Sequence, residues 1–194
     1  MKEIKTGLFF GSFNPIHIGH LIIASTLMNE PELKEIWFVV SPRNPHKLDD
    51  QSLAGGQDRF DMVQQAVQDD PRFRPVDVEF HLPQPNYTID TLTHLSGAFP
   101  DHRFVVIVGE DNLDSFPRWK NYEAILGNYG LLVYPRPGSG RSIRHGLENV
   151  RIIPAPLLDI SASRIRQNIR ERKTVKYLVP DGVLEIIMKR GLYR

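Results

Sequence analysis

The stretch Thr6-Gly-Leu-Phe-Phe-Gly-Ser-Phe-Asn-Pro-Ile-His-Ile-Gly-His20 joins two regular elements through a tight turn. Residues 6–10 are largely apolar and bounded by glycines, so they predict a buried strand. The apolar run that begins at Ile18 predicts a helix of about three turns. Glycine, asparagine and proline between them favour a turn. A helix N-terminus reached from a glycine-bearing turn presents unpaired N–H groups, so this junction is suited to a phosphate.

Two histidines stand at that junction. His17 comes just before the helix and His20 lies in its first turn, so both rings can face the same side. Gly19 between them lets a ligand approach the backbone. Imidazoles donate hydrogen bonds to phosphate oxygens and become more cationic beside them. The alternative is a capping histidine and a solvated one, but the paired spacing favours a phosphate site.

Composition is that of an average soluble protein. The chain has 194 residues, 41% of them hydrophobic and 24% charged, which permits one domain over residues 1–194. It has no cysteine, which excludes disulfides and thiolate metal sites. No apolar run approaches the roughly 20 residues of a membrane span. The N-terminus leads directly into the first strand without a secretory signal, so we expect a cytoplasmic protein that does not bind membranes.

The net charge of +1 hides a gradient along the chain. Residues 141–194 carry 12 basic and five acidic side chains, a net charge of +7, whereas residues 1–140 carry a net charge of −6. A basic region of this kind can bind nucleic acid or a polyphosphate, or it can be a solvated helical surface.

Strands and helices alternate along the chain. Strand, helix and strand within about 40 residues form a βαβ unit with a right-handed crossover. The sequence therefore predicts an α/β fold, Rossmann-like, with an open, mostly parallel sheet and helices on both faces. Strands are expected at 35–40, 74–81, 103–109, 130–134 and 150–153, and helices at 57–68, 86–95, 160–172 and 179–188.

Several loops follow the carboxyl ends of these strands, where ligands bind in open α/β sheets. The loop 41–47 ends in Lys47 and is either an anion site or an exposed basic loop. Gly109 and Asp111 follow the most apolar strand, and a carboxylate there suits a ribose diol. Trp119 sits in a polar setting, where it either stacks on a heteroaromatic ring or packs beneath its loop.

Two helix N-termini add candidate anion sites. Asn86 or Thr88 is expected to cap the helix 86–95, and a ligand can bind there as well. The helix that begins near Ile160 is capped by Ser161 or Ser163, and arginines lie in its first turns. Cations oppose the macrodipole at that end. They become favourable when a multiply charged anion binds, which indicates a polyphosphate.

Two motifs resemble those of the nucleotidylyltransferase superfamily, whose signature is HxGH or TxGH after the first strand. Residues 10–20, FGSFNPIHIGH, resemble its GGTFDPxHxGH motif, and residues 160–166, ISASRIR, resemble ISSTxIR. Within that superfamily the chain is most similar to the bacterial nicotinate-nucleotide adenylyltransferases, a choice supported by residues 41–47, residues 87–92, and Trp119 after Gly109-Glu-Asp111. The resemblance covers nearly the whole chain. It departs at Phe10, Ser12, Asn14 and Ala162.

The resemblance implies adenylyl transfer from ATP to nicotinate mononucleotide by direct in-line attack, giving deamido-NAD and pyrophosphate. Mg²⁺ would bind through the ATP phosphates and not in a protein metal site. The region about 155–194 would complete the ATP site. By resemblance, the catalytic residues are His17, His20 and Arg166. The ATP-binding residues also include Gly11, Ser12, Phe13, Gly109, Asp111, Ile160 and Ser163, and the mononucleotide-binding residues are Lys47, Thr88 and Trp119.

Two other functions remain open at this stage. A pantetheine-phosphate adenylyltransferase would share both end motifs but should lack the stacking tryptophan and the segment 87–92. A nucleic-acid-binding protein would use the basic region from Arg141, where few aromatic residues are interleaved with the cations. We expect no nucleic-acid partner, and the sequence leaves the oligomeric state open.

Overall fold

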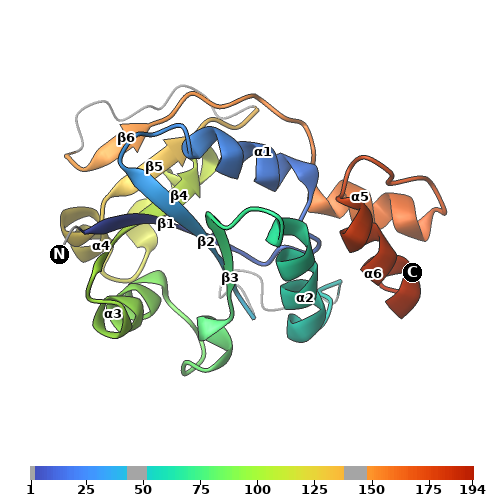
Figure 1. Ribbon diagram of the computed structural model, residues 1–194, viewed down its shortest axis with the longest axis horizontal. Coiled ribbons are helices and arrows are strands. Elements are labelled where there is room, and N and C mark those ends of the chain that lie inside the picture. Colours follow the sequence, from blue (N-terminus) through green and yellow to red (C-terminus); the bar gives the residue numbers. More distant parts are fainter. Residues whose placement is uncertain (1–2, 43–51, 138–147) are drawn as a thin grey trace.

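The computed structural model describes residues 3–42, 52–137 and 148–194 and contains one six-stranded sheet (Figure 1). Its strand order is β3-β2-β1-β4-β5-β6, and every pair is parallel. This confirms the predicted Rossmann-like fold. The strands are β1 (Ile4–Gly11), β2 (Leu33–Val40), β3 (Phe73–Val76), β4 (His102–Gly109), β5 (Leu131–Tyr134) and β6 (Val150–Ile152). The α-helices described are α1 (Ile18–Leu27), α2 (Gly56–Val67), α3 (Thr88–Ala98), α4 (Tyr122–Asn128), α5 (Ala162–Arg170) and α6 (Asp181–Arg190).

Alternating side chains of the central strands build a core on each face of the sheet. In β1, Leu8 faces the core made with α3 and α4, whereas Phe9 faces the core made with α1 and α2. β4 alternates in the same way, with Val106 on one side and Ile107 on the other. Helices on both faces explain why these strands are apolar throughout.

The strand order reverses between β1 and β4. From β1 the chain proceeds through β2 to the edge at β3, then crosses to β4 on the other side of β1. Ligands in such sheets bind beyond the carboxyl ends of the strands at this switch point. The turn after Gly11 and the segment after Gly109 therefore flank the expected site.

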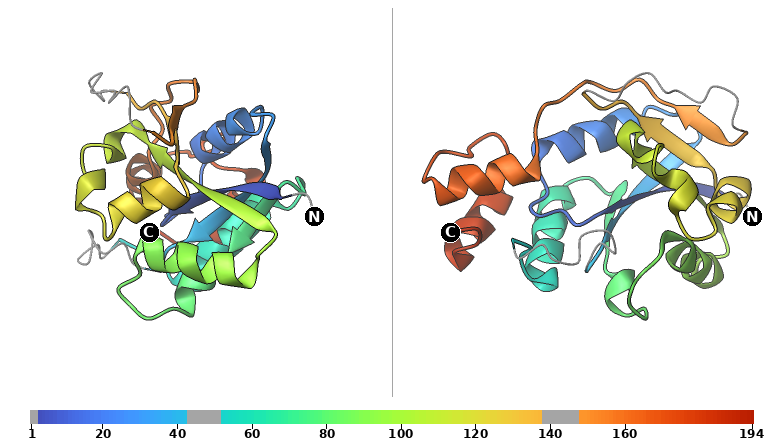
Figure 2. Two further views of the ribbon diagram at one scale, coloured as in Figure 1. Left: turned by 90° about the vertical axis from the view of Figure 1, so that its left-hand side faces the viewer. Right: turned by 180° about the vertical axis from the view of Figure 1, so that it is seen from behind.

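The C-terminal helices α5 and α6 lie at one end of the molecule, far from the N-terminus (Figures 1 and 2). Ile165 of α5 and Val183 of α6 belong to the same core cluster as α1 and α2. Arg190 at the end of α6 forms ion pairs of 2.7 Å with Asp58 and Asp61 of α2. Among the described residues, no helix has the length and apolar character needed to cross a membrane.

The expected strand 74–81 is wrong in its second half. β3 ends at Val76, and residues 78–80 form a 3₁₀ turn, η1 (Val78–Phe80). Val78 packs with the α3 core and Phe80 with the α2 core, so they do not share one face. β3 pairs only with β2, and its ladder with β2 ends at Val39. Alternation in the sequence therefore continued past the end of the strand.

The buried guanidinium of Arg59 in α2 connects the loops at the carboxyl ends of β1 and β2. Its side chain is 1% exposed. Nη1 donates to the carbonyls of Ser12 and Ser41 at 2.6 and 2.7 Å, and Nη2 donates to that of Pro42 at 2.8 Å. Nε donates to the Ala54 carbonyl at 2.9 Å. Arg59 therefore satisfies four carbonyls from three separate segments.

Replacing Arg59 by Met should lower the free energy of unfolding by about 3 kcal/mol or more, because buried carbonyls would lose their donors. Urea denaturation followed by circular dichroism measures the loss. Arg72→Met is the control, since Arg72 pairs with Asp70 at the surface, where an ion pair adds little to stability. Equal destabilisation by the two substitutions would contradict the role assigned to Arg59.

Candidate active site

His17 and His20 stand together at the start of α1. His17 is the N-cap residue, and the two rings stack with centroids 3.7 Å apart. The backbone N–H of His17 donates to Nδ1 of His20 at 3.2 Å. A neutral imidazole that accepts at Nδ1 carries its proton at Nε2. His20 is thereby assigned the tautomer that offers an Nε2–H donor to a ligand.

Both imidazoles are neutral in the free protein at pH 7. Burial, followed by repulsion from Arg136, lowers the pKa of His17 to about 4. Burial also holds the pKa of His20 well below its usual value, and the charges of His17 and Arg136 act in the same direction. Arg136 directly follows the loop residue Pro135 after β5 and joins both histidines in lining a narrow hollow. A polyanion in this hollow would offset the repulsion and favour proton uptake.

The turn before α1 has little freedom. Phe13 has a positive φ of 44°, a region that costs non-glycine residues energy and is often found at functional sites. Its ring is buried and meets His20 edge-on at 5.2 Å. The sequence assigned Phe13 to ATP binding, but only its backbone can face a ligand there. A Cβ on Gly19 would lie 3.0 Å from Nδ1 of His17 and would displace the ring.

The start of α5 meets this turn across the fold. Nη1 of Arg166 donates to the backbone carbonyl of Asn14 at 2.8 Å, and Nη2 lies 3.4 Å from the Ser163 hydroxyl. Ile160 lines the hollow with His17 and His20. The two motifs, about 140 residues apart, therefore lie together. Of the two serines expected as caps, Ser161 caps α5 by accepting from the Arg164 N–H at 3.3 Å.

The ends of β4 and β5 form the next part of this region. Asp111, in η2 (Glu110–Asn112), lies 3.7 Å from Nε of Arg136 in an ion pair. Arg136 also donates to the Tyr134 hydroxyl at 3.0 Å. A Cβ on Gly109 would collide with the Asp111 carboxylate and come within 3.0 Å of Arg136. Glycine is thus needed for these two side chains to approach the strand end.

A second, wider cleft opens on the other side of the β1 turn. Its cavity volume is about 170 Å³, and it is open to solvent at its mouth. Ser12 and Ser41 line one part of it, and Thr88 and Trp119 line another. Trp119 is half-buried, and its ring centroid lies 5.4 Å from that of Phe116. This agrees with packing beneath its loop, whereas stacking on a heteroaromatic ring stays a prediction.

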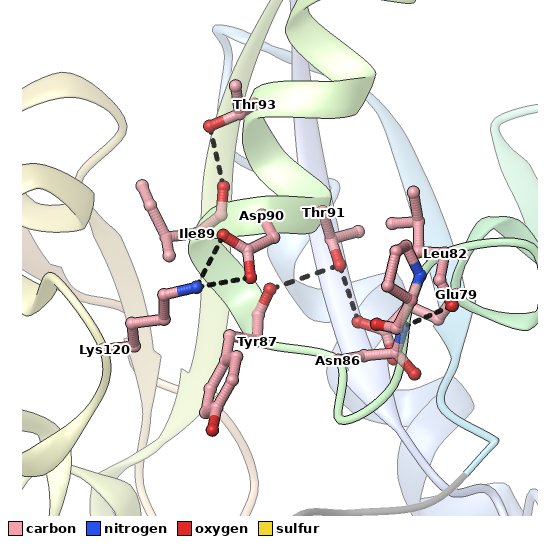
Figure 3. A network of polar contacts seen from close by, with 10 residues as sticks. Glu79, Leu82, Asn86, Tyr87, Ile89, Asp90, Thr91, Thr93 and Lys120 are labelled. Carbon is pink, nitrogen blue, oxygen red and sulfur yellow. Dashed lines mark hydrogen bonds and ion pairs between the residues drawn. The ribbon is translucent and has the colours of Figure 1, made fainter.

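The N-terminus of α3 borders this cleft without a side-chain cap (Figure 3). Tyr87 is the N-cap residue, so the expectation that Asn86 or Thr88 caps the helix is wrong. Asn86 instead points its amide toward the carbonyls of residues 82 and 83. Because the N-cap side chain of Tyr87 accepts from no amide of α3, the N–H groups of Thr88 and Ile89 can donate to an anion. Lys120 pairs with Asp90 at 2.8 Å beside the Tyr87 ring.

Two polar residues, Glu79 of the wider cleft and Arg136 of the narrow hollow, were missed by the sequence analysis. Glu79 is buried, accepts from the Thr91 hydroxyl at 2.9 Å, and has its pKa raised by burial. Arg136 was not among the residues singled out from the sequence. The sequence signal that could have identified Arg136 is its position directly after Pro135, which follows the end of β5.

Lys47, expected to bind the mononucleotide, lies outside the described residues. No cluster of three potential metal ligands occurs in the described part of the chain.

Comparison with known proteins agrees with this geometry. Residues 8–168 match the family model described as cytidylyltransferase-like. A probable nicotinate-nucleotide adenylyltransferase of Cytophaga hutchinsonii is 54% identical over 190 residues, 98% of each chain. The protein of the same name from Flavobacterium psychrophilum is 45% identical over 98% of this chain and 100% of its own.

Solved structures show the same fold. The Plasmodium falciparum nicotinic acid mononucleotide adenylyltransferase complexed with NaAD has a TM-score of 0.83 and covers 98% of both chains at 21% identity. The same enzyme complexed with APC has a TM-score of 0.82 at 20% identity.

Replacing His17 by Gln should reduce the acid sensitivity of folding. Between pH 6.5 and 4 the unfolded chain takes up a proton that the folded chain does not, so stability falls as pH is lowered through this window. The contribution of His17 is about 3 kcal/mol at most. Urea unfolding at pH 7 and pH 4 measures the loss in each protein. His94→Gln, at an exposed position, is the control and should behave as the wild type. An unchanged loss in His17→Gln would refute the buried, neutral state.

Proposed function

The chain belongs to the cytidylyltransferase-like family and, within it, to the nicotinate-nucleotide adenylyltransferases, and we propose that it transfers the adenylyl group of ATP to nicotinate mononucleotide. The products are deamido-NAD and pyrophosphate, a step of NAD biosynthesis. One observation carries the site assignment: Arg166 donates to the Asn14 carbonyl, which brings the start of α5 to the histidine-bearing turn. The open cleft with Thr88 and Trp119 lies beside that turn.

We assign the triphosphate to the N-terminus of α1 and the start of α5. The Nε2–H of His20 donates to the bridge between the α- and β-phosphates, where charge grows as pyrophosphate leaves. His17 stacks behind it and holds its orientation. Ser163 and Arg166 bind the departing phosphates. Because the imidazoles are already dehydrated and fixed, they need little reorganisation as the reaction proceeds.

The acceptor phosphate attacks the α-phosphorus in line, so no protein nucleophile is required. Catalysis then consists of positioning the two substrates and stabilising charge. Mg²⁺, carried on the ATP phosphates, would neutralise part of that charge.

The adenosine of ATP is assigned to the ends of β1 and β4. Gly109 and Asp111 would hold its ribose, and the Arg136 ion pair keeps the Asp111 carboxylate at the strand end. Gly11, Ser12 and Phe13 would contribute backbone groups from the turn, and Ile160 an apolar contact. Arg136 is the one addition to the residues expected from sequence.

The acceptor is assigned to the wider cleft. Trp119 would stack on the pyridine ring, and Thr88 with the open N-terminus of α3 would hold the carboxylate. Lys47 remains a proposal for the mononucleotide phosphate. The stacking tryptophan in the same cleft as Thr88 favours this acceptor over phosphopantetheine. We propose a cytoplasmic location for the reaction.

Pyrophosphate release tests the function directly. The protein is incubated with ATP, Mg²⁺ and one acceptor at a time: nicotinate mononucleotide, nicotinamide mononucleotide or phosphopantetheine. We expect rapid release with nicotinate mononucleotide and the mass of deamido-NAD in the product. Release with phosphopantetheine alone would establish the alternative adenylyltransferase. Salt-sensitive binding to DNA or RNA without pyrophosphate release would support the nucleic-acid-binding alternative.

The value of kcat/KM should be at least about tenfold higher for nicotinate mononucleotide than for its amide, because a charge-assisted hydrogen bond at a helix N-terminus contributes about 1.5–3 kcal/mol. Thr88→Val should reduce this preference, while the KM for ATP stays unchanged. Equal kcat/KM values for acid and amide in the wild type would refute the carboxylate site at Thr88.

Replacing Trp119 by Leu should raise the KM for nicotinate mononucleotide about tenfold, since ring stacking contributes about 1–3 kcal/mol. The KM for ATP should change little, because Trp119 lines the wider cleft and not the narrow hollow beside the histidines. Trp119→Phe is the matched variant, and its retained ring should preserve much of the affinity. A rise in both KM values, or none in either, would contradict the assignment.

A further inference from the structure

Asn14, inside the signature turn, is a junction between four parts of the chain. Its side chain is 3% exposed. Oδ1 accepts from the Ala54 N–H at 3.0 Å and from the Tyr193 hydroxyl at 2.8 Å, and Nδ2 donates to the Ser52 carbonyl at 3.0 Å. Its backbone carbonyl accepts from Arg166. Every one of these partners lies outside the turn itself.

The direction of the Tyr193 hydrogen bond follows from the other two. A backbone N–H can only donate and a backbone carbonyl can only accept, so Ala54 and Ser52 determine which side-chain atom of Asn14 is oxygen. That oxygen needs a donor from Tyr193. The hydroxyl must therefore be protonated, which is consistent with burial raising the pKa of Tyr193.

The end of α6 places Tyr193 at this position. Gly191 has a φ of 62° and ends the helix in the left-handed conformation. The Leu192 N–H then donates back to the Ile187 carbonyl at 3.0 Å, which turns the chain toward the core. Tyr193 packs against the core cluster that includes Phe13. The ion pairs of Arg190 with α2 hold α6 in the required orientation.

Three charged groups from two helices, α5 and α2, surround the Tyr193 hydroxyl. Arg166 of α5 and Arg59 of α2 attract the phenolate form, whereas Asp58 of α2 opposes it. The hydroxyl thus lies near both guanidinium groups that contact the signature turn. The hydroxyl acts on the turn through Asn14, because among the described residues Asn14 is its hydrogen-bond partner.

We propose that Tyr193, which follows α6, is a positioning residue for adenylyl transfer. Tyr193 fixes the Asn14 side chain and so keeps the turn in the conformation in which the Asn14 carbonyl accepts a hydrogen bond from Arg166. The ATP site is therefore complete only when the C-terminal segment has packed. This inference rests on the proposed function. It assigns a role to the segment that follows α6, which lies outside both sequence motifs.

The test is the KM for each substrate in Tyr193→Phe, which removes only the hydroxyl. Loss of one neutral hydrogen bond that orients Arg166 should raise the KM for ATP about three- to tenfold. The KM for nicotinate mononucleotide should stay within about twofold, because Thr88 and Trp119 have no contact with this junction. Tyr177→Phe, at a side chain that is 81% exposed, is the matched control and should leave both KM values unchanged.

A purely structural tyrosine would give a different result. It would lower the melting temperature and the fraction of active enzyme while leaving both KM values as in the wild type, and this outcome would overturn the proposal. The double variant Asn14→Ala/Tyr193→Phe should be no worse for ATP than Asn14→Ala alone, whereas additive losses would also overturn it. If Asn14→Ala does not fold, the two tyrosine variants decide. A wild type without pyrophosphate release would instead refute the proposed function.

Discussion

The need to satisfy buried backbone carbonyls at the carboxyl ends of β1 and β2 organises the site. Loops at the end of a sheet that are covered by helices are shielded from water, so each backbone carbonyl left without a donor there destabilises the fold. Arg59 supplies donors to these loops from α2, and Asn14 joins the β1 turn to residues 52 and 54. Because both side chains are buried, they fix the backbone of the described residues that follow β1 and β2.

The same constraint gives the histidines their chemical state. His17 is buried at the N-cap of α1, His20 is partly buried against the Phe13 ring, and Arg136 adds repulsion to both imidazoles. Both rings are therefore neutral in the free protein. In the proposed reaction a bound triphosphate would bring negative charge that favours their protonation.

Much of the fold was predictable because its signals are local. The strands at β1, β2, β4 and β5 are apolar runs bounded by glycine or polar residues, and α1, α2, α5 and α6 begin close to their expected positions. The error at 74–81 arose because β3 is an edge strand, where pairing with a single neighbour ended the ladder before the alternation ended. The cap of α3 was misassigned because the Asn86 amide found carbonyls in the preceding loop.

The sequence by itself determined the fold class and two motifs suited to phosphate, since hydrophobic period, turn chemistry and helix termini act within a few residues. Only the tertiary structure decided that Arg166 donates to the carbonyl of Asn14, that Arg136 lies beside the histidines, and that Tyr193 completes the junction. These contacts join residues up to 179 positions apart. Their physical basis is the pairing of buried polar groups, which depends on where helices pack and leaves no periodic trace in the chain.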